Sequence, residues 1–313
     1  MTYKQKHLTH SIVMVRPHDF GFNEQTGADN AFQHKPSSVN EAKSIAKKAM
    51  IEFEQMVSIL DKANLEILIL DKPETTDILP DAIFPNNWFS TRVDGQLFIY
   101  PMKTKNRLAE IQSTELKSLL TEHHYKISGT IDLRNEQLKA LEGTGSLIFH
   151  HPTGTLFAAL SERCHTESLE YFATKYDYEL FSFSTSSQVG KSIYHSNVLM
   201  SCGEDFSVIT DQVLTNHASS KSAIDRLTDT VSDVINITEQ QMTESFCGNI
   251  LQLSNSQLQP VIVMSESAYK GFTAPQISIL EKHGSLIICP IPTIEYIGGG
   301  SARCMIAENF LAK

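Results

Sequence analysis

One cysteine, one histidine and one glutamate occupy corresponding places in separate segments of the chain. Cys304 follows GGGSAR, His195 stands in YHSNV, and Glu142 stands in LEGTGS. A thiol, an imidazole and a carboxylate that converge would supply a nucleophile with its acid/base partners. Each residue taken alone also has a structural interpretation, as a buried cysteine, a hydrogen-bonded core histidine or a locally paired carboxylate.

The residues around Cys304 suggest why its thiol would be reactive. We expect Cys304 at the first turn of a helix formed by CMIAENFLAK, where unpaired backbone N–H groups favour an anion. Arg303 adds a neighbouring positive charge. The preceding glycines, from Gly298 to Gly300, allow positive φ and let the backbone approach a ligand closely.

Four segments resemble one another and indicate an internal repeat. They begin at Asn86, Gly143, Ser196 and Gly248. Each opens with small polar residues, runs into an apolar strand, turns, and returns as a second apolar strand. A helical stretch and another short strand follow, so each unit is predicted to have ββαβ order.

The chain ends are predicted to complete a fifth unit. The polar openings recur every 52–58 residues, counted at Asn87, Gly145, Asn197, Asn249 and Ala302. No returning strand follows the fifth opening, GGGSARC, but the N-terminal SIVMVRP could supply one, with residues 38–64 as the helix. Five such units closed in a ring would bring the openings to one axis, where side chains can be aimed at a ligand. An ordinary α/β sheet with similar strands is the alternative.

The composition excludes several classes of protein. The chain has 313 residues, 41% of them hydrophobic, and a net charge of −10 without a basic run, so we expect no nucleic-acid partner. We expect neither a signal peptide nor a membrane span. Five cysteines without CxxC spacing argue against a disulfide scaffold or zinc ribbon and favour the cytoplasm. No metal-ligand spacing is found, so no metal is expected.

Four motifs in order resemble the amidinotransferase-like, or pentein, superfamily: PDAIFPNNWF, LEGTGS, YHSNV and GGGSARC. This superfamily includes arginine deiminases, dimethylarginine dimethylaminohydrolases, succinylarginine dihydrolases and glycine amidinotransferases. MVRPHDFGFNEQTGADNAFQ and IPTIEYIGGGSARCMIAE further resemble its citrulline-utilisation hydrolase branch. Because the resemblance covers nearly the whole chain, it implies one catalytic domain of residues 1–313 with a five-fold pseudosymmetric α/β propeller fold.

The resemblance also implies roles at the matching positions. Cys304 matches the nucleophile, His195 the general acid/base, and Glu142 the carboxylate that holds substrate and imidazole. The expected substrate contacts are Asp81, Asn87, Asn197, Gly300 and two arginines that would grip a carboxylate, Arg163 and Arg107.

Two departures from the guanidine-processing pattern bear on the substrate. Asn87 and Asn197 stand where deiminases place aspartates against a cationic guanidinium. An asparagine offers both a donor and an acceptor, which suits a neutral ureido group, whereas a buried carboxylate facing such a group would lack a partner. We therefore expect hydrolysis of citrulline to ornithine, CO2 and ammonia through a covalent intermediate on Cys304, with no metal or organic cofactor.

Several alternatives stay open at this point. Succinylarginine dihydrolases also use neutral contacts, so a deiminase or dihydrolase acting on a guanidino amino acid remains an alternative, as does an amidinotransferase. A catalytically silent pentein that only binds a partner is the alternative outside enzymes. The polar segment of residues 18–33 is either a lid or a surface connection. The oligomeric state is also open, a homo-oligomer included.

Overall fold

All five sheets in the described part of the chain have three strands joined in the same way. The structure, a computed structural model, describes residues 7–72, 75, 77–188, 190–215 and 218–313. In each sheet the first strand pairs antiparallel with the second, and the third pairs parallel with the second. One or more helices connect the second strand to the third. This order confirms the predicted ββαβ unit.

The strands occupy three equivalent positions in the five sheets. The first strands are β3 (Phe89–Thr91), β6 (Ile148–His150), β9 (Met200–Cys202), β12 (Leu251–Ser254) and β15 (Ala307–Glu308). The second strands are β4 (Gln96–Ile99), β7 (Thr155–Ala159), β10 (Phe206–Ile209), β13 (Pro260–Ser265) and β1 (Ser11–Val15). The third strands are β5 (Gly129–Asp132), β8 (Glu179–Phe183), β11 (Asp233–Asn236), β14 (Ser285–Cys289) and β2 (Glu66–Leu70).

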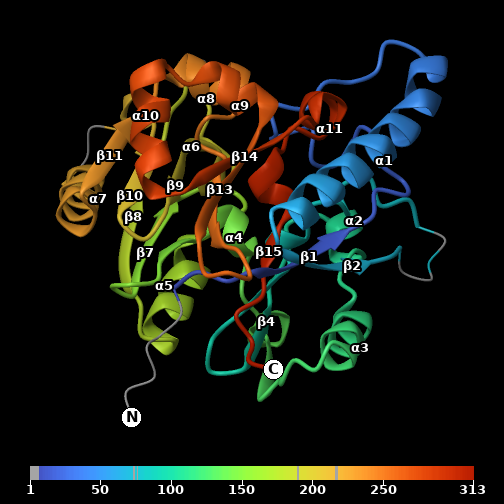
Figure 1. The fold of residues 1–313 in the computed structure, drawn as a ribbon, viewed down its shortest axis with the longest axis horizontal. Helices are drawn as coiled ribbons and strands as arrows, with labels where there is room; N and C mark the ends of the chain where they lie inside the picture. Colours follow the sequence, from blue (N-terminus) through green and yellow to red (C-terminus); the bar gives the residue numbers. More distant parts are fainter. Residues whose placement is uncertain (1–6, 73–74, 76, 189, 216–217) are drawn as a thin grey trace.

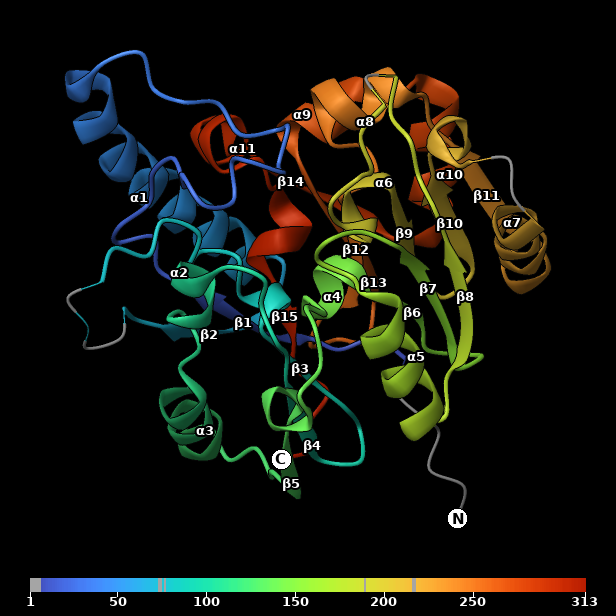
Figure 2. The same cartoon turned by 180° about the vertical axis from the view of Figure 1, so that it is seen from behind.

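The longer connecting helices lie around the outside of the molecule (Figures 1 and 2). They are α1 (Val39–Lys62), α3 (Ser113–Glu122), α5 (Thr166–Lys175), α7 (Ala218–Thr230) and α10 (Ala274–His283). The shorter ones are α2 (Lys105–Leu108), α8 (Glu239–Ser245), α9 (Glu266–Gly271) and α11 (Pro292–Gly298), with 3-10 turns η2 (Leu133–Glu136) and η3 (Asp211–Val213).

The two ends of the chain build the fifth sheet, as predicted. β1 pairs antiparallel with β15, with Val13 opposite Ala307, and parallel with β2, with Ser11 opposite Glu66. The helix of this unit, α1, begins where Ser38 accepts a hydrogen bond from the backbone N–H of Glu41. Its buried residues recur at three- and four-residue intervals, which places one apolar stripe against the sheet: Ile45, Ala49, Phe53, Met56 and Leu60.

Short helical turns stand at four of the five polar openings. They are η1 (Pro85–Asn87), α4 (Gly143–Ser146), α6 (Ser196–Leu199) and η4 (Ala302–Met305), and the fourth unit opens with a turn at residues 247–248. α4 lies near the middle of the molecule (Figure 2) and packs against η1 and α6, while η1 packs against η4.

Hydrogen bonds link these openings to one another. Thr144 Oγ1 donates to the carbonyl of Asn86 at 3.2 Å, and Asn249 Nδ2 donates to the carbonyl of Asn197 at 2.7 Å. The backbone N–H of Arg303 donates to Asn249 Oδ1 at 3.1 Å. Residues more than 50 positions apart in the sequence are thereby held in one polar layer.

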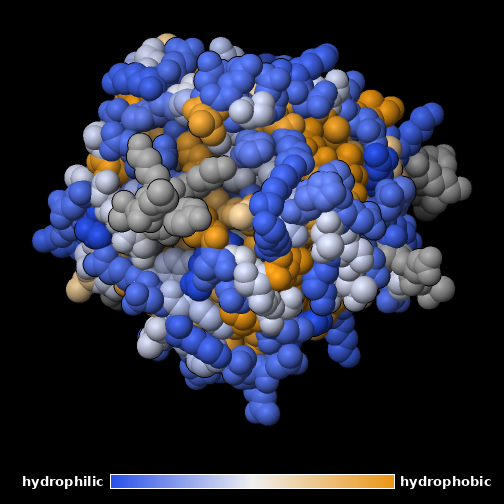
Figure 3. Space-filling view, turned by 60° about the horizontal axis from the view of Figure 1, so that its bottom comes forward, coloured by the Kyte–Doolittle hydropathy of each residue, from blue (hydrophilic) through white to orange (hydrophobic). Residues whose placement is uncertain are grey.

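The face of the molecule in Figure 3 is largely hydrophilic. On the face shown in Figure 3, hydrophobic residues emerge only in patches between charged and polar ones. Of the helices within the described ranges, none is both long and apolar enough to cross a membrane.

Candidate active site

The predicted site residues lie together around one small cavity at the polar layer. Seven of the nine line the cavity directly: Asp81, Asn87, Arg107, Arg163, His195, Gly300 and Cys304. The other two, Glu142 and Asn197, are buried and form hydrogen bonds to lining residues. The convergence expected from the repeat is therefore present in the structure.

Cys304 stands in a 3-10 turn, not at the start of a helix. The turn η4 ends at Met305, and the chain then enters the short strand β15, because its residues complete the sheet with β1. The Arg303 guanidinium also points elsewhere, donating to the carbonyl of Ile306 at 3.0 Å and to Glu308 Oε2 at 3.0 Å. The predicted C-terminal helix and its anion-stabilising first turn are therefore wrong.

Two amide groups hold the sulfur of Cys304. Asn249 Nδ2 lies 3.3 Å from Sγ and Asn197 Nδ2 lies 3.4 Å from it. Burial raises the pKa of the Cys304 thiol, and the hydrogen bonds from these amides and the charge of Arg303 offset this only in part. The thiol is therefore the resting form, and the amides are placed to stabilise a thiolate once it forms.

Glu142 and His195 form a buried hydrogen-bonded pair beside the cavity. His195 Nε2 lies 2.7 Å from Glu142 Oε2, and the backbone N–H of Lys103 donates to Oε1 at 2.9 Å. Burial alone would raise the pKa of Glu142, but Arg163 and His195 outweigh it and lower the pKa to about 2. Burial lowers the pKa of His195 although Glu142 opposes this, so the imidazole is neutral at pH 7. With Nε2–H donated to Glu142, Nδ1 is left as a proton acceptor.

Gly145 allows the polar groups to come this close. A Cβ at this position would lie 2.2 Å from Asn87 Nδ2 and 3.0 Å from the His195 ring. Any side chain here would displace both groups, which explains the second glycine in LEGTGS. Gly300 is similarly crowded, since a Cβ there would lie 3.0 Å from the ring of Phe84 and 3.4 Å from Cys304 Cβ.

Arg163 is fully buried and already has an anionic partner. Its guanidinium lies over the ring of Tyr194, 4.9 Å from the centroid, and its Nη1 lies 3.6 Å from Glu142 Oε2. Asp29, from the segment of residues 18–33, accepts from both Nε and Nη2 of Arg163 and also from Lys103 Nζ. Arg163 and Lys103 together lower the pKa of Asp29 against the effect of burial.

Arg107 is also buried, and it fixes the orientation of Asn87. Its Nη1 donates to Asn87 Oδ1 at 2.8 Å, and its Nε donates to Glu110 Oε2 at 2.9 Å. Nη2 donates to the carbonyls of Phe84 and Asp81 at 3.0 and 3.3 Å. Because Asn87 Oδ1 must accept from Arg107, its Nδ2 faces the other way, and that atom is buried without a hydrogen-bond partner among the described residues.

The segment of residues 18–33 covers the site. Asn23 Nδ2 and Thr26 Oγ1 donate to Asp81 Oδ2 at 2.7 and 2.8 Å, and Gln33 Nε2 donates to the carbonyl of Gly298 at 3.1 Å. Asn30 and Gln33 line the cavity itself. Of the two interpretations open from the sequence, the structure therefore supports a cover over the site.

Several residues of the site escaped prediction. The repeat marked Asn249 as the polar residue of the fourth opening, but the sequence assigned it no role in the site. Asp29, Gln33 and Lys103 lie outside the repeat, so no periodic signal points to them. Among the described residues, no group of three or more His, Cys, Asp or Glu side chains could hold a metal ion.

Fold and site together place the chain in the amidinotransferase-like, or pentein, superfamily. The family described as N,N dimethylarginine dimethylhydrolase, eukaryotic, matches residues 16–311, and the chain belongs to this family of hydrolases that act on C–N bonds. No curated protein sequence matched the chain significantly.

Solved structures share the fold at low sequence identity. The N-terminal domain of ArgZ, described as an arginine dihydrolase from the ornithine–ammonia cycle in cyanobacteria, has a TM-score of 0.69 and 16% identity, covering 95% of this chain and 97% of that chain. A DDAH from Pseudomonas aeruginosa in complex with citrulline has a TM-score of 0.66 and 12% identity, covering 97% and 100%. AgrE in complex with ornithine and NAD+ has a TM-score of 0.69 and 17% identity, with 95% of this chain but only 39% of that chain covered.

Proposed function

We propose that the protein hydrolyses the ureido group of citrulline, giving ornithine, CO2 and ammonia, with Cys304 as nucleophile. In this proposal His195 is the general acid/base and Glu142 orients it. The cavity has a volume of only about 10 Å³, so the substrate enters it when the covering segment of residues 18–33 moves. Residues 1–313 act as one catalytic domain in which the five units close as a propeller, and the five unpaired cysteines suit a reducing cytoplasm.

The orientation of Asn87 carries the choice of substrate. Its Oδ1 accepts from Arg107, so Nδ2 is the donor that is left without a partner among the described residues and is available to a ligand. A guanidinium has only N–H donors and leaves that amide unpaired, at a cost of about 1–3 kcal/mol for a buried polar group. The carbonyl oxygen of a ureido group would accept from it.

Unpartnered acceptors complement the N–H groups of the same substrate. Asp81 Oδ1, Gln33 Oε1 and Asn197 Oδ1 are buried without hydrogen-bond partners in the part of the chain that the structure describes. A ureido group carries three N–H bonds and one carbonyl oxygen, so one donor and several acceptors match its pattern.

The amino-acid end of the substrate would replace a contact within the protein. Arg163 is proposed to bind the substrate carboxylate, but Asp29 holds it in the structure. A carboxylate of the substrate can take over the same guanidinium when the segment of residues 18–33 shifts. Arg107, whose N–H groups mostly bind protein atoms, would act on the substrate chiefly by orienting Asn87.

The proposed reaction has two balanced steps. His195 Nδ1 takes the proton of the Cys304 thiol, and the thiolate attacks the ureido carbon while the amides of Asn197 and Asn249 hold the sulfur. Collapse breaks the bond to the δ-nitrogen, and His195 returns the proton to the departing ornithine. His195 then takes a proton from water, which attacks the S-carbamoyl group and releases carbamate and the thiol. Carbamate decays to CO2 and ammonia.

A second candidate is an arginine dihydrolase. Within the described residues no cation contacts Cys304 Sγ, and a substrate guanidinium would supply one. Asp81 Oδ1 could accept from it, and ArgZ, which shares the fold, is described as such an enzyme.

Incubation of the purified protein with citrulline, arginine and methylarginines, followed by quantification of ornithine, ammonia and urea, tests both candidates. Ornithine from citrulline but not from arginine supports the proposal. Ornithine and ammonia from arginine at the higher rate would replace it with the second candidate, and turnover of neither would exclude both.

A further inference from the structure

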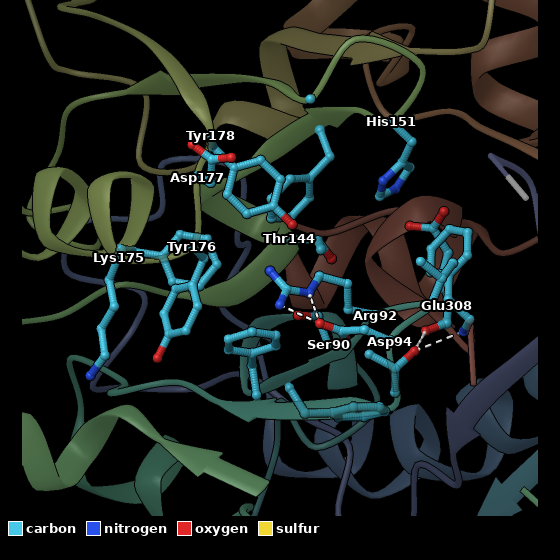
Figure 4. Close-up of a pocket in the computed structure, with 18 residues that line it drawn as sticks. Ser90, Arg92, Asp94, Thr144, His151, Lys175, Tyr176, Asp177, Tyr178 and Glu308 are labelled. Atoms are coloured by element: carbon cyan, nitrogen blue, oxygen red, sulfur yellow. Dashed lines mark hydrogen bonds and ion pairs between the residues drawn. The ribbon is translucent and has the colours of Figure 1, made fainter. Parts of the chain in front are cut away.

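A second cavity lies beside the α4 turn, whose Thr144 lines it. It has a volume of about 470 Å³ and is bounded by the hairpin β3–β4, the hairpin β6–β7, the end of α5 and the chain end after β15. Figure 4 shows His151 and Glu308 at one end of it and Tyr176 and Lys175 at the other, with Arg92 between them. Its volume is typical of small-molecule sites. No residue of the proposed mechanism lines it.

Aromatic rings make up most of the apolar wall of this second cavity. The rings that line it include Phe98, Phe149, Phe172, Tyr176, Tyr178 and Phe310. Arg92 already packs against two of these rings. Its guanidinium lies 5.6 Å from the Phe98 centroid and 5.8 Å from the Tyr176 centroid. These rings therefore present faces that attract a positive charge.

A mostly buried carboxylate, Glu308, stands at one end of the second cavity (Figure 4). Glu308 Oε2 accepts from Arg303 at 3.0 Å, and the side chains are 13% and 8% exposed. Burial raises the pKa of Glu308, and Arg303 offsets this only in part. Oε1 has no hydrogen bond to any residue that the structure describes, so a second cation at this carboxylate would be stabilising.

His151 adds a neutral polar group at the same end of the second cavity (Figure 4). Its ring packs on Phe149, with centroids 5.6 Å apart, and against Phe310 at 4.7 Å. Burial lowers the pKa of His151 to about 4, so the imidazole is uncharged at pH 7 and can accept a hydrogen bond. Neither ring nitrogen has a hydrogen bond within the described ranges, which leaves both for a ligand.

The cations that line the second cavity are already paired. Arg92 binds Asp94 through Nε and Nη2, and Lys175 Nζ donates to Glu136 Oε1 at 3.2 Å. An anionic ligand would find these cations occupied and would meet Glu308 inside. The charge of the cavity thus favours a cation over an anion.

We propose that this second cavity binds a small organic cation, an amidinium, guanidinium or primary ammonium on a flat apolar body. The cation donates to Glu308 Oε1 and to a ring nitrogen of His151, and the apolar body lies between the aromatic rings. This site is separate from the catalytic cavity, so its occupancy does not require the proposed citrulline chemistry.

Calorimetric titration of the full chain with benzamidine tests the site, because this probe is a flat aromatic amidinium. Benzamide, which has the same shape without the charge, is the matched ligand. We expect one benzamidine per chain, at least about tenfold tighter than benzamide, since a hydrogen bond between charged groups is stronger than one between neutral groups. Equal affinities of the two ligands, or no binding of benzamidine, would overturn the proposal.

Three variants locate the bound probe. Glu308→Gln should weaken benzamidine at least about tenfold, whereas Cys304→Ala in the catalytic cavity should leave its affinity unchanged. Glu179→Gln is the matched control, because that exposed carboxylate also pairs with an arginine, Arg226. A loss with Cys304→Ala but not with Glu308→Gln would place the probe in the catalytic cavity and contradict the assignment.

The variant His151→Phe tests the same binding site if Glu308→Gln does not fold. His151→Phe keeps a ring between Phe149 and Phe310 and removes only the two nitrogens. It should weaken benzamidine about fivefold while the thermal unfolding midpoint stays close to that of the parent. Unchanged affinity in this variant, together with crystals soaked in benzamidine that show no density beside Glu308, would exclude the site.

Discussion

The two sides of the catalytic cavity carry negative charge in different ways. On the acid/base side, Glu142 is ionised permanently, because His195 and Arg163 lower its pKa to about 2. On the sulfur side, Cys304 has only amide donors as close partners, and burial raises the pKa of its thiol. Glu142 is thus charged in the resting protein, whereas in the proposed reaction Cys304 becomes charged only after substrate has bound.

This difference bears on the step at which the Cys304 thiol loses its proton. A permanent thiolate would need a cation beside the sulfur, but Arg303 turns away to Glu308. In the proposed mechanism the thiol proton therefore leaves when substrate is bound, with neutral His195 as the acceptor. Amide donors fixed in advance stabilise the developing anion without having to reorganise.

Removal of the thiol is the largest expected effect. Cys304→Ala should lower turnover at least about 10⁴-fold, because the variant lacks the thiol that forms the covalent intermediate. Mass spectrometry of an acid-quenched parent reaction should show a carbamoyl adduct on the peptide that contains Cys304 and on no other cysteine peptide. Activity close to the parent in this variant would end the proposed mechanism.

Removal of the negative charge of Glu142 is expected to have the next largest effect on turnover. Glu142→Gln keeps the shape but should lower kcat about 10²–10⁴-fold, because His195 loses the carboxylate that orients it and stabilises its protonated form. Steady-state kinetics would measure the change. Arg163→Lys, which keeps a positive charge beside Glu142, is the comparison and should lower kcat less; an equal loss in both would contradict the assigned roles.

The same substitution predicts an effect on acid stability. The pKa of Glu142 is lowered in the folded protein from 4.5 to about 2, so its contribution is present above pH 4.5 and is lost as the pH falls toward 2. Urea unfolding at pH 7 and at pH 3 should therefore give a larger difference in unfolding free energy between the parent and Glu142→Gln at pH 7. The same difference at both pH values would argue against a lowered pKa.

One isosteric substitution can replace the hydrogen-bond donor at the Cys304 sulfur with an acceptor. Asn249→Asp keeps the acceptor for the Arg303 N–H but replaces the donor to Cys304 Sγ with a carboxylate oxygen. We expect kcat/KM to fall about 10–100-fold, since a hydrogen bond to a charged group is lost. The thiol pKa, measured from the pH dependence of iodoacetamide alkylation, should rise. A lower kcat/KM with an unchanged alkylation profile would mean that Asn249 only supports the turn.

The repeat explains how much of this could be predicted from the sequence. Polar openings at regular spacing predicted the ββαβ units, the sheet shared by both chain ends, and the convergence of Cys304, His195 and Glu142. The structure around Cys304 was predicted wrongly. Residues 304–313 were predicted to form a helix, whereas Ala307 and Glu308 pair with β1. Sheet completion across about 300 residues outweighs the local propensity of a short segment.

The partners of the predicted arginines depend on contacts that leave no pattern in the sequence. Arg163 is held by Asp29, and Arg107 is held by Glu110 and Asn87. The sequence predicted both arginines as grips for a substrate carboxylate. Only the folded chain shows that each already has a carboxylate partner, because the segment of residues 18–33 is irregular and carries no periodicity.

The charge of the substrate can be tested at Asn87. Asn87→Asp replaces the Nδ2 donor that faces the cavity with an acceptor, while Arg107 keeps an oxygen to bind. The ratio of kcat/KM for arginine to that for citrulline should rise about tenfold or more, because a carboxylate pairs with a cation and leaves a ureido carbonyl without a donor. Asn87→Ala removes both groups and should lower both rates without this preference. An unchanged ratio in Asn87→Asp would remove the main support for citrulline.

The smallest expected effect concerns the cover over the site. Asp29→Asn keeps the side-chain size but removes the negative charge that competes for Arg163 and Lys103. If the substrate carboxylate must displace Asp29, the KM for citrulline should fall about threefold while kcat changes little, because ground-state competition is relieved and the reacting groups stay in place. Asp94→Asn, which removes a carboxylate from a surface arginine pair in the second cavity, is the control and should leave KM unchanged. A higher KM in Asp29→Asn would instead show that Asp29 holds Arg163 in the geometry that binds the substrate.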